Sequence, residues 1–196
     1  MNTLILATKN THKTKEFQSV FNNSITIEDL TRLQYNNEII ENGETFIENA
    51  LIKCREIYTK FNQPVLADDS GLSVKALNGK PGVLSARFGG EGLSDQDRYM
   101  LLLEKMKETK EREASFVCAL VLYISPNRIF IIQEECKGYI AEKPSGVYGF
   151  GYDPVFFLPQ FNRSMAELSE SEKNEISHRG KAAKQLLKLI PELFCM

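Results

Sequence analysis

PVLADDSGL, residues 64–72, sets two aspartates directly after a short apolar run. The run 64–67 is typical of a strand buried on both faces, and we expect it to end at residues 68–71. Neighbouring side chains of a strand face opposite ways, so Asp68 and Asp69 should differ in role: one faces a site, and the other ties down backbone N–H groups of the turn. Active sites of α/β proteins tend to form at such strand ends. The alternative is a plain solvated turn.

Outward from this stretch, short apolar strands alternate with helices. Segment 45–61 is the clearest helix, because its apolar residues recur at helical spacing, and Ser94 or Asp95 could cap another. The other expected elements are strands at 4–7, 25–30, 115–124, 128–135 and 154–158, helices after loop 8–14 and after Ser177, a partly helical stretch at 166–175, and loops at 77–92 and 143–151. The pattern predicts an α/β or α+β protein with a mixed sheet, and it leaves the strand order open.

Composition excludes several classes of function. The chain has 196 residues, which favours one domain, and its net charge of −2 argues against a surface that binds nucleic acid. No apolar run approaches a membrane helix, and no signal peptide is visible. Four cysteines without a C-x-x-C pair predict reduced thiols in a cytoplasmic protein; they are Cys54, Cys118, Cys136 and Cys195.

The loop TKNTHK, residues 8–13, lies between an expected strand and an expected helix. Free N–H groups of a first helical turn, together with the helix dipole, attract anions, and this loop adds hydroxyls, a carboxamide and two ammonium groups. The loop has no glycine and is therefore not a Walker A loop. The alternative is a solvated loop in which a Thr or Asn caps the helix.

Carboxylates near the helix 45–61 suggest a second site. Glu41 lies just before this helix. If Glu41 approaches Asp69, the two carboxylates form an oxygen-rich site of the kind that Mg²⁺ prefers. The alternative leaves the glutamates of this region solvated.

The third group of polar and aromatic residues lies in segment 149–179. GFGYDP at residues 149–154 sets aromatics between glycines, so that a ring face stays open for a base to stack upon. His178 and Arg179 open the last helix, where cations oppose the dipole, and both can donate to a carbonyl oxygen. The alternatives are a tight turn with core aromatics and an exposed basic helix start.

Together these segments resemble the inosine triphosphate pyrophosphatase family, the dITP/XTP pyrophosphatases. The matching segments are LATKN at 6–10 with Lys13, ENG at 41–43, TFIENA at 45–50, LADDSGL at 66–72, PGVLSARF at 81–88, GFGYDPVF at 149–156 and SHRGKA at 177–182. They occur in one order across nearly the whole chain, which makes the resemblance specific.

The resemblance implies one nucleoside-triphosphate pyrophosphatase domain over residues 1–196. It would be an elongated, two-lobed α/β fold with a long bent mixed β-sheet flanked by helices and a nucleotide cleft between the lobes. A Mg²⁺-dependent, cytoplasmic homodimer would hydrolyse ITP, dITP and XTP to the monophosphate and pyrophosphate, with no nucleic-acid or membrane partner.

Residue roles carried over from the family fall into phosphate, metal and base groups. Glu41 and Asp69 would bind the metal, and Asp69 would be the base for the attacking water. The substrate-binding residues implied are Thr8, Asn10 and Lys13 for the triphosphate, Ser70 beside Asp69, Lys53 and Lys173 for phosphate charge or the nucleotide, Phe150 for stacking with Gly151 and Tyr152 in the same loop, and Asp153, His178 and Arg179 for the purine edge. The chain departs from the family at Cys54 and at residues 11–12, and keeps every carboxylate and lysine that the mechanism needs.

Three other functions compete with this one. A pyrophosphatase of the related septum-formation-inhibitor type would act on pyrimidine or modified nucleotides, and the pair His178 and Arg179 argues against it. A nucleotide-binding regulator would lack turnover, which intact Glu41 and Asp69 disfavour. A purely structural protein would leave the polar motifs unexplained.

Overall fold

The computed structural model describes residues 3–22 and 24–194, so that Cys195 lies outside the described part. The strands are β1 (Thr3–Leu6), β2 (Thr26–Asp29), β3 (Val65–Val74), β4 (Glu113–Ser125), β5 (Arg128–Ile140), β6 (Phe156–Leu158) and β7 (Arg163–Ser164). The helices are α1 (Thr11–Phe21), α2 (Phe46–Phe61), α3 (Asp95–Lys105), α4 (Glu170–Ile176) and α5 (His178–Phe194). Short 3-10 turns are η1 (Lys75–Leu77), η2 (Gly82–Arg87), η3 (Asp153–Val155) and η4 (Met165–Glu167).

The described strands form one sheet in the order β2-β1-β3-β4-β5-β6-β7. β1 pairs in parallel with β2 and β3, whereas β6 pairs antiparallel with β5 and β7. The predicted mixed sheet with flanking helices is therefore confirmed. No helix within the described residues combines the length and the apolar character that a membrane span needs.

The chain divides into two compact units. Unit 1 comprises Met1–Asp69, Cys118–Glu134 and His178–Met196, and unit 2 comprises Ser70–Val117 and Glu135–Ser177. The division falls inside β3, directly after Asp69. Each unit has its own apolar core.

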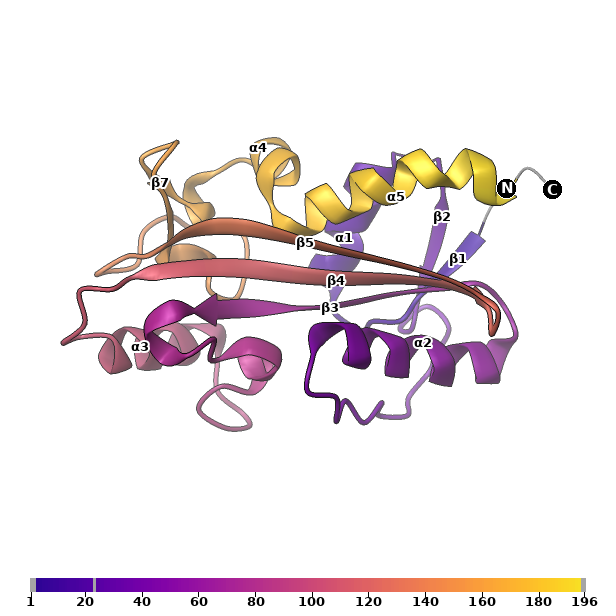
Figure 1. Ribbon diagram of the computed structural model, residues 1–196, viewed down its shortest axis with the longest axis horizontal. Coiled ribbons are helices and arrows are strands. Elements are labelled where there is room, and N and C mark those ends of the chain that lie inside the picture. The colour runs from indigo at the N-terminus through magenta and orange to yellow at the C-terminus, as the bar shows by residue number, and fades with distance from the viewer. Residues whose placement is uncertain (1–2, 23, 195–196) are drawn as a thin grey trace. The chain divides into compact units, whose positions relative to one another are not determined.

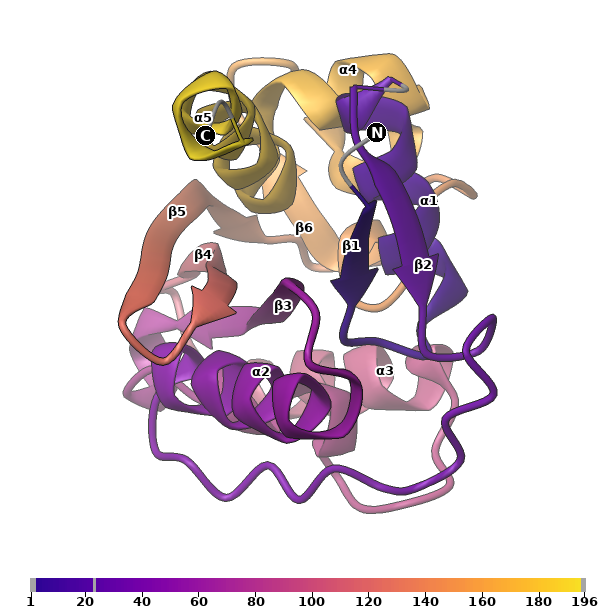
Figure 2. The ribbon, with the colours of Figure 1, turned by 90° about the vertical axis from the view of Figure 1, so that its right-hand side faces the viewer.

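In unit 1, helices cover both faces of the sheet. Figures 1 and 2 show α2 on one side of the strands and α1 with α5 on the other. Leu4 and Leu6 pack with the α1 and α5 core, whereas Ile5 and Ala7 pack with the α2 core. This alternation is the reason why the run 4–7 is apolar throughout.

The same alternation continues along β3. Leu66 belongs to the α1 and α5 core, and Val65 and Ala67 belong to the α2 core. Since strand side chains alternate, Asp68 should follow Leu66 to the α1 and α5 face, and Asp69 should follow Ala67 to the α2 face. The contacts described below follow this assignment.

Strand β3 is longer than the sequence predicts. We expected it to end at residues 68–71, but it continues to Val74, so no turn forms at the aspartates. The strand can continue because the buried carboxylates meet cations inside the fold. Gly71 also matters, since a Cβ there would collide with Ser85 and with the Gly82 carbonyl oxygen.

In unit 2, one core joins helix α3 to the sheet. Leu102 and Met106 of the α3 region pack with Leu72 and Val74 of β3 and with Phe156 of β6. Ser94 caps α3 as expected. Three further differences from the expected elements lie here: the 3-10 turns η1 and η2 occupy part of the predicted loop 77–92, β5 runs on to Ile140, and η3 takes the first part of segment 154–158.

The cysteines of the described residues are consistent with reduced thiols. Cys54, Cys118 and Cys136 are buried and free of disulfides. Burial raises the pKa of the Cys54 and Cys118 thiols, which keeps both protonated at neutral pH.

Candidate functional site

The loop before α1 uses its polar side chains to fix its own backbone. Asn10 caps α1, because its Oδ1 accepts from His12 N at 2.9 Å and from Lys13 N at 3.3 Å. Thr8 Oγ1 accepts from Asn10 N at 3.1 Å. The first turn of α1 contains no acidic residue that would neutralise the helix dipole. The start of α1 thus retains the electrostatic character expected of an anion site.

Lys53 joins Glu41 and Asp69, the two carboxylates whose approach the Mg²⁺ hypothesis requires. Its Nζ lies 2.8 Å from Glu41 Oε2 and 3.0 Å from Asp69 Oδ1. Lys53 comes from the middle of α2 and is buried, whereas Glu41 precedes that helix and Asp69 lies in β3. Three segments that are distant in sequence therefore place their charged groups around one point.

The entry into α2 explains how Glu41 reaches this point. Thr45 and Glu48 form a capping box that fixes the first turn of the helix. A Cβ on Gly43 would lie 2.7 Å from Glu48 Cβ, so only glycine lets the chain pass this closely over the helix start. Gly43 N donates to Asn49 Oδ1 at 2.8 Å, and Asn49 Nδ2 donates to Asp69 Oδ2 at 3.3 Å. Asn49 thereby couples the segment after Glu41 to the catalytic candidate.

Burial and the ammonium group set different proton affinities in this cluster. Burial raises the pKa of Asp69 above its ordinary value, although Lys53 and Lys13 oppose the shift. Burial also opposes ionisation of Glu41, but there the attraction of Lys53 outweighs it, and the pKa of Glu41 is lowered. Burial disfavours the charged form of Lys53, yet Asp69 and Glu41 raise its pKa. Two neighbouring carboxyls with opposite shifts are typical of acid–base sites, and Asp69 has the higher affinity for a proton.

Glu41 and Asp69 are the two carboxylates that the sequence analysis expects to bind Mg²⁺. Among the described residues, no group of three or more His, Cys, Asp and Glu side chains is placed to hold a metal ion. Mg²⁺ commonly takes only one or two protein carboxylates and completes its shell with water and phosphate oxygens. The ammonium of Lys53 already marks a point where positive charge is stabilised by both carboxylates.

Asp68 belongs to a separate ion-pair network on the other face of β3. Arg179 Nε lies 2.7 Å from Asp68 Oδ2, and Arg179 Nη1 lies 2.5 Å from Glu16 Oε2. Lys13 Nζ lies 3.3 Å from Asp68 Oδ2, and Cys118 Sγ lies 3.5 Å from Asp68 Oδ1. Burial alone would raise the pKa of Asp68, but Arg179 and Lys13 hold it well below its usual range. The turn that one of the two aspartates was expected to tie down does not form, because β3 continues through both of them.

His178 and Arg179 open α5 and are buried, which excludes the exposed basic helix start. Arg179 is 3% exposed and forms the ion pairs just described. Ser70 lies in β3 next to Asp69 and is half-buried. Reading of a purine edge by His178 and Arg179 stays a prediction.

In unit 2, Phe150, Asp153 and Lys173 form one cluster. Asp153 Oδ2 accepts from Phe150 N at 2.9 Å and from Lys173 Nζ at 2.6 Å. The Lys173 ammonium lies over the Phe150 ring, 4.8 Å from its centroid. Asp153 and Lys173 are buried, and a Cβ on Gly149, whose φ is +77°, would collide with the Asp153 carboxylate. The segment is thus a tight turn, as one alternative held, and it also fixes an aromatic ring against a cation.

Further contacts hold the loop that follows Phe150. Gly151 N donates to Asp95 Oδ2 at 2.8 Å, and the Tyr152 hydroxyl donates to the Ser85 carbonyl oxygen at 2.9 Å. Tyr152 is buried in the core of unit 2, so it supports the loop from beneath.

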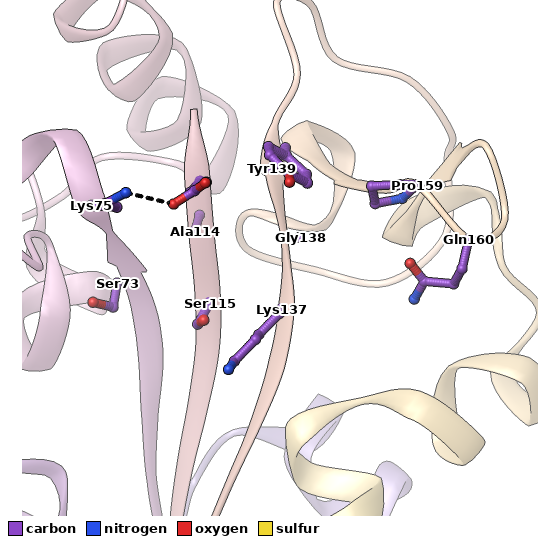
Figure 3. A pocket seen from close by; sticks show the side chains of 10 residues that line it. Ser73, Lys75, Ala114, Ser115, Lys137, Gly138, Tyr139, Pro159 and Gln160 are labelled. Atoms are coloured by element: carbon purple, nitrogen blue, oxygen red, sulfur yellow. Dashed lines mark hydrogen bonds and ion pairs between the residues drawn. The ribbon is translucent and has the colours of Figure 1, made fainter. Parts of the chain in front are cut away.

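The described part of unit 2 also has an open depression of about 650 Å³. Figure 3 shows it over β3, β4 and β5, with Lys75 paired to Glu113 at its side. Its lining residues are Ser73, Lys75, Glu113, Ala114, Ser115, Lys137, Gly138, Tyr139, Pro159 and Gln160. None of them is a predicted site residue, and we assign the depression no role.

Sequence reasoning missed three polar partners. Asn49 lies four residues before Lys53 on α2, and Glu16 lies three residues after Lys13 on α1, so helical spacing places each on the face of a predicted site residue. That spacing could have identified both. Asp95 contacts Gly151 across 56 positions of sequence, and no local signal reveals such a contact.

Comparisons with known proteins agree on one family. A model of the Ham1 family matches residues 4–189. A protein of Bacillus anthracis named dITP/XTP pyrophosphatase is 43% identical over 199 residues, covering 99% of this chain and 98% of that protein. A protein of the same name from Bacillus subtilis is 42% identical over 193 residues, covering 97% of this chain and 98% of that protein. The solved structure of a HAM1 protein from Coxiella burnetii superposes with a TM-score of 0.90 at 40% identity, covering 98% of this chain and all of that one.

Proposed function

The chain belongs to the Ham1 family, and from this premise we propose that it hydrolyses ITP, dITP and XTP to the nucleoside monophosphate and pyrophosphate with the help of Mg²⁺. The observation that carries the proposal is the meeting of Glu41 and Asp69 at the Lys53 ammonium. Removal of these triphosphates from the nucleotide pool is the cellular role that follows.

In this mechanism Asp69 accepts the proton of the water that attacks near the α-phosphate, and the bond between the monophosphate and the departing pyrophosphate breaks. Its raised pKa gives it a higher affinity for that proton than an ordinary aspartate has. Lys53 holds Asp69 and Glu41 in place, and Asn49 fixes the second oxygen of Asp69. Mg²⁺, when held by Glu41 and Asp69, would neutralise phosphate charge and acidify bound water.

The residues around the start of α1 would bind the phosphates. The dipole of α1, whose first turn contains no acidic residue, and the Lys13 ammonium favour negative charge there. Thr8 and Asn10 shape this turn through their hydrogen bonds, and Ser70 would contact substrate beside Asp69. Phosphoryl transfer requires positioning and positive charge more than covalent chemistry, so we propose direct attack by water.

The family resemblance assigns base recognition to Phe150, Asp153, His178 and Arg179, and we propose the same roles here. Phe150, whose ring lies against the Lys173 ammonium, would stack on the purine. Asp153, His178 and Arg179 would read the purine edge, where hypoxanthine and xanthine carry an oxygen at C6. Adenine presents an amino group instead and would leave buried donors unpaired, which can discriminate by orders of magnitude.

A homodimeric state and a cytoplasmic location are proposed along with this function, on the family resemblance. Size-exclusion chromatography with light scattering tests the dimer. A dimer should have twice the chain mass of 22.3 kDa. A monomer at all protein concentrations would contradict it.

The decisive experiment is a panel of nucleoside triphosphates assayed with Mg²⁺, with pyrophosphate and orthophosphate measured separately. We expect pyrophosphate from ITP, dITP and XTP and little product from ATP or the pyrimidine triphosphates. Orthophosphate alone would identify a simple phosphatase, and neither product would identify a binding protein without turnover. The Asp69→Asn variant, prepared in parallel, controls for contaminating hydrolases.

A further inference from the structure

The loop that carries Phe150 is rich in glycines with positive φ. Gly146, Gly149 and Gly151 have φ values of +82°, +77° and +63°. Glycine in this region has many alternative conformations, so the ordered loop requires contacts that select one of them. Asp153 supplies one such contact from within the loop, by accepting from Phe150 N. Asp95 supplies another from outside it, by accepting from Gly151 N at 2.8 Å.

Asp95 is available for this contact because other residues cap its helix. Ser94 and Asp97 form the capping box of α3: Ser94 Oγ accepts from Asp97 N, and Asp97 Oδ2 accepts from Ser94 N, each at 3.1 Å. The two oxygens of Asp95 then have separate partners. Oδ1 pairs with Arg98 Nη1 at 3.2 Å, one helical turn along α3, and Oδ2 accepts from Gly151 N. The ion pair with Arg98 fixes the side chain so that the second oxygen faces the loop.

The same two charged side chains lie close to the next residue of the loop. Burial raises the pKa of Tyr152, the positive charge of Arg98 opposes this rise, and the negative charge of Asp95 adds to it. The Tyr152 hydroxyl in turn donates to the Ser85 carbonyl oxygen. The first turn of α3 therefore contacts the loop at Gly151, and its charges act on Tyr152 as well.

We propose that Asp95 is a positioning residue for the base-binding loop: it holds the Gly151 amide, and with it the turn that presents Phe150, in one conformation before substrate binds. The proposal rests on the proposed function where it assigns Phe150 to the base. Half of the Asp95 side chain is exposed, at 54%, so the contact can open, and its loss should loosen the loop without unfolding unit 2.

The test uses amide hydrogen exchange of the full-length, ¹⁵N-labelled chain, read at the Gly151 amide by NMR. For Asp95→Ala we expect exchange at Gly151 to become about 10-fold faster, since a hydrogen bond to a charged acceptor is lost. Asp95→Asn keeps an oxygen acceptor and removes the charge, and it should retain most of the protection. Gln96→Ala, an exposed neighbour on α3, is the matched control and should exchange like the wild type. Circular dichroism melting checks that each variant is folded.

Kinetics with ITP supply the second readout. We expect Asp95→Ala to raise KM by about 3- to 10-fold while kcat changes less than about twofold, because the loop acts in binding rather than in chemistry. Unchanged exchange at Gly151 would overturn the proposal, and so would faster exchange with unchanged KM. If Asn and Ala at position 95 loosened the loop equally, the charge rather than the hydrogen bond would matter, and the positioning contact as proposed would be wrong. A wild-type chain without turnover would refute the proposed function, and the exchange rates would still decide whether Asp95 orders the loop.

Discussion

Asp68 and Asp69 are the same residue type, but they lie on opposite faces of β3 in two different environments. On the α1 and α5 face, Asp68 is 1% exposed and pairs with Arg179 and Lys13. On the α2 face, the Asp69 side chain is 11% exposed, and it shares the Lys53 ammonium with Glu41, which is 31% exposed. The pKa of Asp68 is held low and that of Asp69 is raised. Two neighbouring positions thus separate a carboxylate kept permanently charged from one that can exchange a proton.

Adjacency in sequence therefore says little about the role of a residue when a strand lies between two helical layers. Asp68 has a cation on each of the two helices that cover its face, so its charge contributes to the folded state. Asp69 is left with access to solvent and with a neighbouring carboxylate, which is the arrangement that metal binding and proton transfer need. The comparison can be tested by changing each face separately.

The largest expected effect is on turnover. Asp69→Asn should reduce kcat by about 10²- to 10⁴-fold, because the amide cannot accept the proton of the attacking water. Its shape is conserved, so the contacts with Lys53 and Asn49 can largely remain. Since the pKa of Asp69 is raised in the folded state, loss of its charge should cost less stability than loss of the Asp68 charge, and the melting temperature should change by only a few degrees. Steady-state kinetics with ITP and thermal melts of the same preparation measure both. Near-normal turnover would remove Asp69 as the base.

The corresponding substitution on the α1 and α5 face, Asp68→Asn, should lower the stability of the fold. Asp68→Asn leaves Arg179 buried with one charged partner fewer, and we expect a loss of about 3 kcal/mol in the free energy of unfolding, the low end for a broken buried pair because Glu16 still contacts Arg179. Urea unfolding at neutral pH measures this loss. A variant that kept its stability and lost its activity would reverse the roles assigned to the two faces.

The difference in stability between the wild type and Asp68→Asn should depend on pH in a definite direction. The pKa of Asp68 is depressed in the folded state, so its contribution is complete above the pKa of the unfolded chain and is lost as pH falls toward the folded value. The stability advantage of the wild type over Asp68→Asn should therefore be constant above about pH 5 and shrink below it. An advantage that grew on acidification would contradict the depressed pKa.

Much of the fold could be predicted from the apolar pattern. Residues 4–7 and 64–67 were correctly assigned to strands because both of their faces are buried, which leaves an unbroken apolar run. The end of β3 was predicted wrongly. A pair of aspartates normally ends a strand, and here Arg179 compensates for Asp68 across 111 positions of sequence. Local patterns carry no information about so distant a partner.

The site was predicted to a similar extent. Spacing and residue type suggested that Glu41 could approach Asp69, and the family resemblance supplied the roles. The structure adds that a buried lysine joins the two carboxylates. Helical spacing would have indicated Asn49. The role of Asp95, by contrast, depends on its contact with the Gly151 amide, which is set by how α3 packs against that loop. Contacts made by the backbone of one segment with the side chain of another cannot be read from sequence.

Magnesium should distinguish the two faces with a moderate effect. Mg²⁺ at a concentration of ten times its Kd should stabilise the wild type by about 1.4 kcal/mol, because the ion binds only the folded chain. Glu41→Gln should abolish this gain, since it removes one of the two proposed ligands. Glu16→Gln removes a carboxylate from the other face and should leave the gain intact. Melts with and without Mg²⁺, and turnover after chelation with EDTA, measure the two halves of this prediction. Equal responses in both variants would mean that the ion does not bind at Glu41.

An effect of similar size is expected at Asn49, which joins the segment after Glu41 to Asp69. Asn49→Ala leaves the Gly43 amide and one Asp69 oxygen without this partner, at a cost of about 1–2 kcal/mol in stability. Because Asp69 would then be less firmly oriented, kcat should also fall by roughly 3- to 10-fold. Cys118→Ala is the counterpart on the other face: it removes a thiol that contacts Asp68, and it should lower stability slightly while leaving kcat unchanged. If Cys118→Ala reduced kcat as much as Asn49→Ala did, the two faces would be coupled, and orientation of Asp69 could no longer be assigned to the α2 side alone.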